Sequence, residues 1–245
     1  MDEASAAGPE VLARIAGGAM LYDASCLGQP AAEVFDPAHW QARNAWQGER
    51  GGRGTVAFLR TDDGRQWVLR HYRRGGFVAR LLDDRYVWSG AARTRAFAEW
   101  RLLRQLRAWR LPVPRPIAAR YRRQGVLYRA DLITEALPVR RTLAAALRQA
   151  PLPESRWRAI GRCVGALHAR GVHHADLNAH NLLVGEQDDD VYVLDFDRGR
   201  VRARGAWERA VLARLRRSLE KVTQGLPPDR FAEPQWRALL EAATS

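Results

Sequence analysis

The sequence predicts an α+β fold with two lobes, in which a small β-rich N-terminal lobe precedes a mainly helical C-terminal lobe. Short apolar stretches typical of strands occur over residues 55–134, whereas apolar residues recur at helical spacing over residues 142–242. A proline-rich stretch at residues 111–116 marks a waist in the chain. With 245 residues, the chain is long enough to bury a substantial core in either one domain or two joined lobes.

The expected division of the chain follows these patterns. Residues 1–45 are rich in Ala and Gly, contain three prolines and show little periodicity, so we expect an N-terminal extension there. The N-lobe is expected at residues 46–137 and the C-lobe at residues 138–245. A ligand is expected in the crevice between the two lobes.

The N-lobe elements are read from alternation and turn signals. Strands are expected at residues 55–60 and 66–72, because an Asp-Asp-Gly turn separates two apolar stretches. A helix is expected at residues 91–109, which ends where the prolines begin. A second hairpin is expected from strands at residues 117–121 and 125–134.

The C-lobe elements are mostly helices with apolar residues on one face. A short hairpin around an acidic turn interrupts them. The expected elements are helices at residues 142–149, 154–170, 206–222 and 234–242, and strands at residues 182–184 and 191–194.

The chain is strongly basic, and its cations are almost all arginine. The net charge is +13, and Lys221 is the only lysine among 40 Lys and Arg residues. Such a charge indicates an anionic partner, which can be nucleic acid, a phospholipid surface or a phosphorylated substrate, or else a solvated basic face. No recognisable nucleic-acid-binding module accompanies the charge. Two cysteines are too few for a disulfide framework.

Neither a membrane-spanning stretch nor a secretory signal is evident in the sequence. The longest stretches without a charged residue have nine residues, whereas a transmembrane helix needs about 20. The N-terminus does not combine a basic start, an apolar stretch and a small-residue cleavage site. We therefore expect a cytoplasmic setting.

Three polar residues of the C-lobe have a spacing suited to phosphate chemistry. Asp176 and Asn181 are five residues apart after a predicted helix, and Asp195 follows the second strand of the short hairpin. Asn and Asp oxygens suit Mg²⁺, which takes its remaining ligands from water and phosphates. Asp176 could then orient a hydroxyl group and accept its proton.

These residues resemble the catalytic and metal-binding motifs of the protein-kinase-like superfamily. The resemblance implies a bilobal protein-kinase-like fold, ATP as the phosphate donor and Mg²⁺ as the metal. It makes Asp176 the catalytic aspartate, Asn181 and Asp195 the metal ligands, and Asn178 a polar catalytic-loop residue near the γ-phosphate.

Further kinase-like features occur earlier in the chain and in the expected order. The glycines of residues 51–58 resemble the phosphate-binding loop, Arg70 occupies the position of the phosphate-binding lysine, and Glu99 is placed to pair with it. Residues 133–137 resemble the hinge that receives adenine through backbone groups. The resemblance thus implies nucleotide-binding roles for Gly51, Gly52, Gly54, Arg70, Glu99 and Glu135.

Within the superfamily, the chain is more similar to the Kdo kinase family, where Kdo is 3-deoxy-D-manno-octulosonic acid. Three stretches carry this similarity: residues 67–76 (WVLRHYRRGG), 174–181 (HADLNAHN) and 194–198 (LDFDR). The similarity implies transfer of phosphate from ATP to the 4-hydroxyl of the Kdo sugar in a Kdo-lipid A precursor, in lipopolysaccharide inner-core biosynthesis. It also implies a peripheral protein on the anionic cytoplasmic face of the bacterial inner membrane, with no nucleic-acid partner. Nothing in the sequence specifies an oligomeric state.

The chain departs from the general kinase pattern at three positions. Arg70 replaces the usual lysine, Ala175 replaces the arginine before the catalytic aspartate, and Asp197 replaces a glycine. Arginine keeps the charge but is longer and planar. A catalytically inactive kinase-like adaptor is therefore one alternative. Another small-molecule kinase, of the heptose or aminoglycoside type, is a second, and a basic nucleic-acid-binding protein is a third.

Three histidines near the catalytic motif offer a different interpretation. His173, His174 and His180 could bind zinc, although no fourth ligand has a suitable spacing. We favour the simpler expectation that His174 is a hydrogen-bonded support for the catalytic loop.

Overall fold

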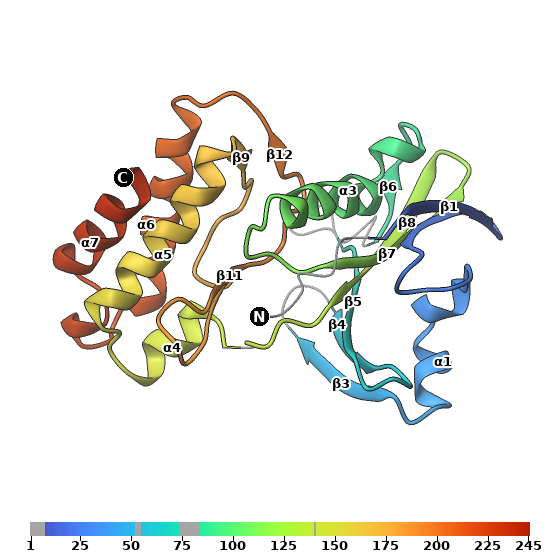
Figure 1. The fold of residues 1–245 in the computed structure, drawn as a ribbon, viewed down its shortest axis with the longest axis horizontal. Helices are drawn as coiled ribbons and strands as arrows, with labels where there is room; N and C mark the ends of the chain where they lie inside the picture. Colours follow the sequence, from blue (N-terminus) through green and yellow to red (C-terminus); the bar gives the residue numbers. More distant parts are fainter. Residues whose placement is uncertain (1–7, 52–54, 74–83, 140) are drawn as a thin grey trace. The chain divides into compact units, whose positions relative to one another are not determined.

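The fold is described from a computed structural model, which covers residues 8–51, 55–73, 84–139 and 141–245. The chain forms two compact units (Figure 1). The N-terminal unit comprises Met1–Ala108 and Pro114–Ala136, and the C-terminal unit comprises Trp109–Val113 and Leu137–Ser245. The first is built on a β-sheet and the second mainly on helices, so the predicted α+β fold is confirmed.

The N-terminal unit contains an eight-stranded antiparallel sheet. Its strands are β1 (Glu10–Ile15), β2 (Gly18–Asp23), β3 (Trp46–Gly51), β4 (Thr55–Arg60), β5 (Gln66–His71), β6 (Tyr86–Val87), β7 (Pro116–Gln124) and β8 (Leu127–Glu135). The strand order is β1-β2-β7-β8-β5-β4-β3, and β6 pairs with β8. Both predicted hairpins are therefore present, the first as β4–β5 and the second as β7–β8.

The two faces of this sheet bury different elements. The short turn η2 (Ala91–Arg93) leads into helix α3 (Arg95–Ala108), which packs on β7 and β8 and buries Phe97 and Trp100. Side chains alternate between the faces along each strand. The opposite face accordingly holds a separate apolar cluster that includes Phe35 and Trp67.

Residues 8–45, within the region predicted as an extension, supply β1, β2 and much of this second cluster. They also form the 3-10 turn η1 (Ala32–Phe35) and helix α1 (Pro37–Gln41). Asp36 caps α1, because its carboxylate accepts a hydrogen bond from the Ala38 N–H at 3.0 Å. Strand β2 is buried at five of its six positions, so it lacks the apolar–polar alternation by which exposed strands are recognised.

The C-terminal unit consists of helices with two small strand pairs. Its elements are α4 (Leu143–Gln149), α5 (Glu154–Ala169), β9 (Val172–His173), β10 (Leu182–Val184), β11 (Val191–Val193), β12 (Arg200–Val201), α6 (Trp207–Thr223), η3 (Pro228–Arg230) and α7 (Glu233–Thr244). The four predicted helices and the β10–β11 hairpin are confirmed with nearly the expected bounds. Among the described residues, none of the helices has the length and apolar character needed to span a bilayer.

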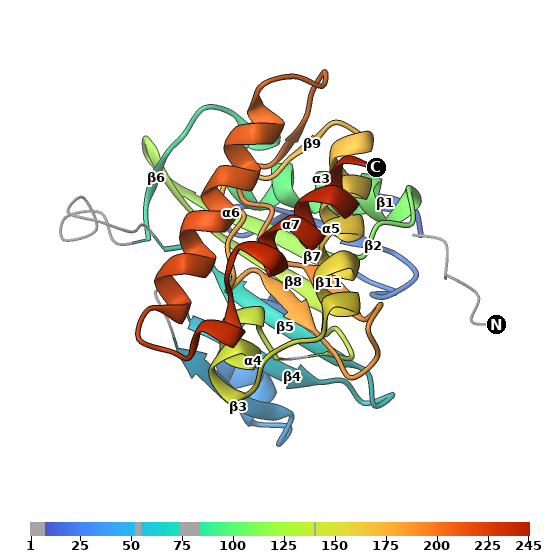
Figure 2. The ribbon, with the colours of Figure 1, turned by 90° about the vertical axis from the view of Figure 1, so that its left-hand side faces the viewer.

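Helices α5 and α7 lie side by side because glycines remove side chains from their contact (Figures 1 and 2). A Cβ atom on Gly161 would collide with the Leu239 carbonyl oxygen, and one on Gly165 would lie 2.8 Å from the Ala243 carbonyl oxygen. This packing fixes α5, and α5 leads through β9 into the loop that carries Asp176, Asn178 and Asn181.

Candidate active site

In the N-terminal unit, Arg70 forms an ion pair with Glu99 across the interface between β5 and α3. The Tyr72 hydroxyl donates a 2.5 Å hydrogen bond to the same Glu99 carboxylate oxygen. Arg70 in turn donates to the Tyr72 hydroxyl at 3.0 Å, and its guanidinium lies 4.7 Å from the centre of the Tyr72 ring. The expected pair is therefore present, and Tyr72 is a third member that the sequence did not indicate.

Burial of the contact between Arg70, Tyr72 and Glu99 keeps the Tyr72 hydroxyl protonated. The side chain of Glu99 is only 3% exposed, whereas that of Arg70 is 21% exposed. Burial, reinforced by the Glu99 charge, raises the pKa of Tyr72 well above its usual value, so its hydroxyl stays protonated as a donor. Arg70 therefore occupies a fixed position on the sheet. Its contact with nucleotide phosphates stays a prediction.

The other predicted nucleotide-binding residues are only partly described. Gly51 is the last residue of β3, whereas Gly52 and Gly54 lie outside the described residues. Glu135 is the last residue of β8, and its N–H donates to the Arg115 carbonyl oxygen at 2.8 Å. This hydrogen bond holds the end of β8 within the sheet, so the Glu135 amide is used by the protein itself.

In the C-terminal unit, His174 connects the two loops that carry the predicted catalytic and metal-binding residues. Its Nε2 lies 2.9 Å from the Leu194 carbonyl oxygen, and its Nδ1 lies 3.1 Å from the Asp176 backbone nitrogen. Because a carbonyl only accepts and a backbone N–H only donates, the ring is the neutral tautomer with its proton on Nε2. Burial lowers the pKa of His174, which favours this neutral form. The expectation that His174 supports the catalytic loop is confirmed.

Two asparagine amides organise the loop around the Asp176 carbonyl oxygen. The side-chain nitrogens of Asn178 and Asn181 donate to this oxygen at 2.8 Å and 3.0 Å. The Asn178 side-chain oxygen accepts from the His180 N–H at 2.9 Å, so both ends of its amide serve the loop. A role for Asn178 near a γ-phosphate stays a prediction.

Asn181 and Asp195 are brought together by the β10–β11 hairpin. The Leu194 N–H donates to the Asn181 carbonyl oxygen at 2.8 Å, which places Asp195 one residue beyond this contact. Asp195 has a φ of 62°, a conformation that non-glycine residues seldom adopt, and it turns the chain out of the hairpin. The next residue, Phe196, is fully buried against the His174 ring. The position of Asp195 is therefore fixed from both sides.

The carboxylate of Asp176 faces helix α6, where it forms an ion pair with Arg214. The Arg214 Nε lies 2.7 Å from the Asp176 Oδ1. Both side chains are about half exposed, at 50% for Arg214 and 54% for Asp176. One turn further along α6, the Ser218 hydroxyl accepts from the Ala179 N–H at 3.1 Å. Helix α6 therefore contacts the catalytic loop at two points.

The donors at this hairpin suit a hard cation that is also held by phosphates. The side-chain oxygen of Asn181 and the carboxylate of Asp195 are the oxygen ligands that Mg²⁺ accepts. Among the described residues, no group of three or more His, Cys, Asp or Glu side chains could hold a metal ion. This finding contradicts a zinc site at the histidines, because His173, His174 and His180 all lie in the described part of the chain.

Comparison with known proteins identifies the family. The sequence pattern of the "Lipopolysaccharide kinase (Kdo/WaaP) family" matches residues 37–242. The chain belongs to this family. A protein named 3-deoxy-D-manno-octulosonic acid kinase from Vibrio parahaemolyticus serotype O3:K6 is 41% identical over 200 residues, which are 82% of this chain and 83% of the relative. One of the same name from Stenotrophomonas maltophilia strain R551-3 is 45% identical over 210 residues, covering 84% and 81%.

Solved structures support the fold independently. An amicoumacin kinase, in a complex with AMP-PNP, Ca²⁺ and a ligand abbreviated Ami, matches with a TM-score of 0.59 at 12% identity. The match covers 82% of this chain and 72% of that chain. The predicted kinase-like fold and the predicted family are both confirmed.

Proposed function

We propose that the chain transfers phosphate from ATP to the Kdo sugar of a Kdo-lipid A precursor, as a step in lipopolysaccharide inner-core biosynthesis. The main support for this proposal is the family match. Relatives named Kdo kinases are also 41–46% identical to the chain over more than four-fifths of its length. The presence of Asp176, Asn181 and Asp195 in a hydrogen-bonded loop arrangement supports an active enzyme rather than an inactive adaptor.

In the proposed reaction, the 4-hydroxyl oxygen of the acceptor forms a bond to the γ-phosphorus of ATP. The bond between that phosphorus and the β–γ bridging oxygen breaks, and ADP leaves with the electron pair. Asp176 orients the hydroxyl and accepts its proton. The contacts of His174 and the two asparagines support this role, because they hold the loop in place before the acceptor arrives.

We propose phosphate-binding roles for residues of the N-terminal unit and metal-binding roles for residues of the C-terminal unit. Arg70, held by Glu99, would contact phosphate oxygens, and Asn181 with Asp195 would hold Mg²⁺. When bound, this metal neutralises the charge that develops on the phosphates. The glycines at positions 51, 52 and 54 and the backbone near Glu135 are proposed to complete the nucleotide site.

The position of Arg214 supports the proposal that the acceptor carries a negative charge. Kdo carries a carboxylate, and Arg214 already binds a carboxylate, that of Asp176, next to the proposed reaction centre. Arginine binds carboxylates through two parallel hydrogen bonds. We therefore propose that Arg214 contacts the acceptor carboxylate while Asp176 contacts the hydroxyl.

The setting is proposed to be the cytoplasmic face of the inner membrane, where the protein would bind peripherally. The net charge of +13 supports attraction to an anionic lipid surface.

Two substitutions test the chemistry. Asp176→Asn should lower phosphate transfer by about 10²–10⁴-fold, because it removes the base but keeps the shape of the side chain. Asp195→Ala should abolish the Mg²⁺ dependence of ATP binding, measured by calorimetry with and without the metal. Turnover by Asp176→Asn within a factor of a few of wild type would exclude Asp176 as the base. Unchanged metal dependence in Asp195→Ala would place the metal elsewhere.

A further inference from the structure

We propose that one end of the N-terminal sheet docks on an anionic lipid bilayer and seats a lipid phosphate group in a basic pocket. This end, called here the hairpin-end surface, is formed by the β1–β2 turn, the β7–β8 turn and β6. The proposal deepens the peripheral membrane binding suggested above by naming the surface and its ligand. Its test uses neither ATP nor the acceptor, so its failure is distinguishable from failure of the proposed enzyme activity.

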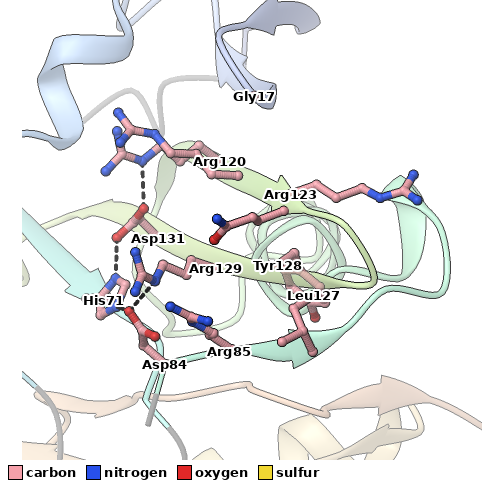
Figure 3. A pocket seen from close by; sticks show the side chains of 12 residues that line it. Gly17, His71, Asp84, Arg85, Arg120, Arg123, Leu127, Tyr128, Arg129 and Asp131 are labelled. Carbon is pink, nitrogen blue, oxygen red and sulfur yellow. Dashed lines mark hydrogen bonds and ion pairs between the residues drawn. The ribbon is translucent and has the colours of Figure 1, made fainter. Parts of the chain in front are cut away.

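The pocket has a volume of about 440 Å³, which is ample for a phosphate group and part of its carrier (Figure 3). Arginine is the residue type that recurs most often in its lining. Among the described residues, five arginines and two aspartates line it, so the positive charges of these residues exceed the negative ones by three even with His71 neutral: Arg85, Arg120, Arg122, Arg123, Arg129, Asp84 and Asp131.

Some of these charged side chains are linked to one another at the bottom of the pocket, called here the floor. Asp131 accepts hydrogen bonds from Arg120 at 2.6 Å and from His71 at 2.7 Å, and Asp84 lies 3.3 Å from His71 and pairs with Arg129. Figure 3 shows these groups as a connected chain. The hydrogen bond to Asp131 raises the pKa of His71, which adds positive charge under mildly acidic conditions. The two aspartates are thus occupied within the floor.

The rim carries the cations that a ligand would meet. Arg85, Arg122 and Arg123 are all exposed. Arg123 is held in place, because its Nε donates to the Gly125 carbonyl oxygen at 2.8 Å and its guanidinium lies 4.9 Å from the centre of the Trp88 ring. An anion entering the pocket therefore meets the exposed side chains of Arg85 and Arg122 above a floor whose carboxylates are already paired, while the Arg123 guanidinium is held over the Trp88 ring.

The pocket is separate from the proposed nucleotide site. His71 and Arg70 are neighbours on β5, so their side chains point to opposite faces of the sheet. Arg70 is on the face that contacts α3 through Glu99, and His71 is on the other. A phosphate in this pocket is therefore not a phosphate of the nucleotide held by Arg70.

Exposed apolar side chains beside the arginines favour a lipid surface over other anions. Val126, in the β7–β8 turn, is 74% exposed, and Val87 on β6 is 64% exposed. They are two of the four large apolar residues classed as exposed in the described part of the chain. Their strands are linked, since Val87 pairs with Leu127 and the Trp88 N–H donates to the Val126 carbonyl oxygen at 2.9 Å.

This combination matches the chemistry of a membrane interface. Arginines attract anionic headgroups, exposed valines enter the boundary of the acyl chains, and tryptophan prefers the headgroup level. Nucleic acids and free phosphate would use the arginines but gain nothing from the valines. A bilayer uses both features at once.

The first test is co-sedimentation with vesicles of phosphatidylcholine, with and without phosphatidylglycerol. Wild-type protein should sediment only with the anionic vesicles. Arg85→Gln and Arg122→Gln should each weaken this binding about fivefold, the value expected for one basic residue near an anionic surface. Val126→Asp should weaken it as well, because it leaves every arginine in place but replaces an exposed apolar side chain by a negative charge that the anionic surface repels. Thermal unfolding of each variant verifies that it is folded.

Matched controls on the C-terminal unit make the test specific. Arg209→Gln removes one exposed arginine of α6, and Val201→Asp adds a charge at a valine that is 42% exposed. Both controls should bind vesicles like wild type. Equal losses in the controls and the hairpin-end variants would overturn the proposal, because binding would then reflect overall charge alone.

Trp88 provides a direct readout of the docked surface. With vesicles that contain brominated lipid, wild-type fluorescence should be quenched more than that of Trp88→Phe. Inorganic phosphate should compete weakly at matched ionic strength, because it lacks the lipid carrier. Full competition by phosphate, full competition by an oligonucleotide, or equal quenching in both proteins would contradict lipid docking at this surface.

Discussion

Arg214 provides a sharp test of how the acceptor is recognised. The perturbation is Arg214→Met, which keeps much of the length of the side chain but removes its charge and its hydrogen-bond donors. Because both members of the Arg214–Asp176 pair are about half exposed, we expect their interaction to stabilise the free protein by at most about 1 kcal/mol. The variant should therefore fold normally.

The effect on catalysis should be much larger. A charge-assisted hydrogen bond from Arg214 to the acceptor carboxylate would contribute about 1.5–3 kcal/mol, so its loss should lower kcat/KM by about 10- to 150-fold. The same variant should lose less than about fivefold with an acceptor whose Kdo carboxylate has been reduced to an alcohol, because that acceptor never makes the contact.

The assay is initial-rate phosphate transfer with the two acceptors and the two proteins, which together form a thermodynamic cycle. Arg217→Met, one turn further along α6, is the matched control and should behave like wild type with both acceptors. Equal losses for the native and the reduced acceptor would refute carboxylate recognition. Arg214 would then act only by positioning Asp176.

Three other predictions follow from buried contacts. Arg70→Ala removes the cation that pairs with the buried Glu99 carboxylate, which still accepts the Tyr72 hydrogen bond, so it should lower the free energy of unfolding by about 1–3 kcal/mol and nearly abolish ATP binding, whereas Arg70→Lys should retain part of both. Because burial lowers the pKa of His174, this side chain binds a proton more readily in the unfolded chain than in the folded one below about pH 6.5. Urea denaturation should therefore show stability falling with acid, and less steeply in His174→Gln. Gly161→Ala should cost about 1–3 kcal/mol by forcing α5 from α7, whereas Gly28→Ala, with open space around its Cβ, should cost little in the same assay.

Regular elements with clear periodicity were predictable from the sequence. Helices α5, α6 and α7 each bury one apolar face, and the strand pairs β4–β5 and β10–β11 surround recognisable turns. Their bounds agree with the expectation because local patterning and tertiary packing favour the same structure there.

The N-terminal strands were not predictable in this way. Strand β2 is buried on both faces, and β1 is an edge strand whose partner lies in that same weakly patterned region. Their place beside β7 depends on a pairing more than 90 residues away in the chain, between Gly18 and Arg122. Only tertiary structure supplies such a pairing.

Some residues of the candidate site were likewise predictable from the sequence, and others were not. Motif spacing indicated Asp176, Asn181 and Asp195, and the resemblance to kinases indicated the Arg70–Glu99 pair. Arg214 was missed, since one arginine within an arginine-rich amphipathic helix carries no distinguishing signal. Its spacing of four residues from Ser218 places both on one face of α6, but only the structure shows that this face contacts the catalytic loop.

The most direct test of the proposed Kdo kinase activity is phosphate transfer by the purified wild-type chain, with ATP and Mg²⁺, to a Kdo-bearing lipid A precursor in micelles. Free Kdo, a heptose and an aminoglycoside serve as competing acceptors, and Asp176→Asn serves as the inactive control. We expect one added phosphate on the lipid-borne Kdo, placed at its 4-hydroxyl by nuclear magnetic resonance, and little transfer to the other acceptors. Folded, ATP-binding protein that leaves the Kdo lipid unmodified, or that prefers the aminoglycoside or the heptose, would contradict the proposed Kdo kinase activity.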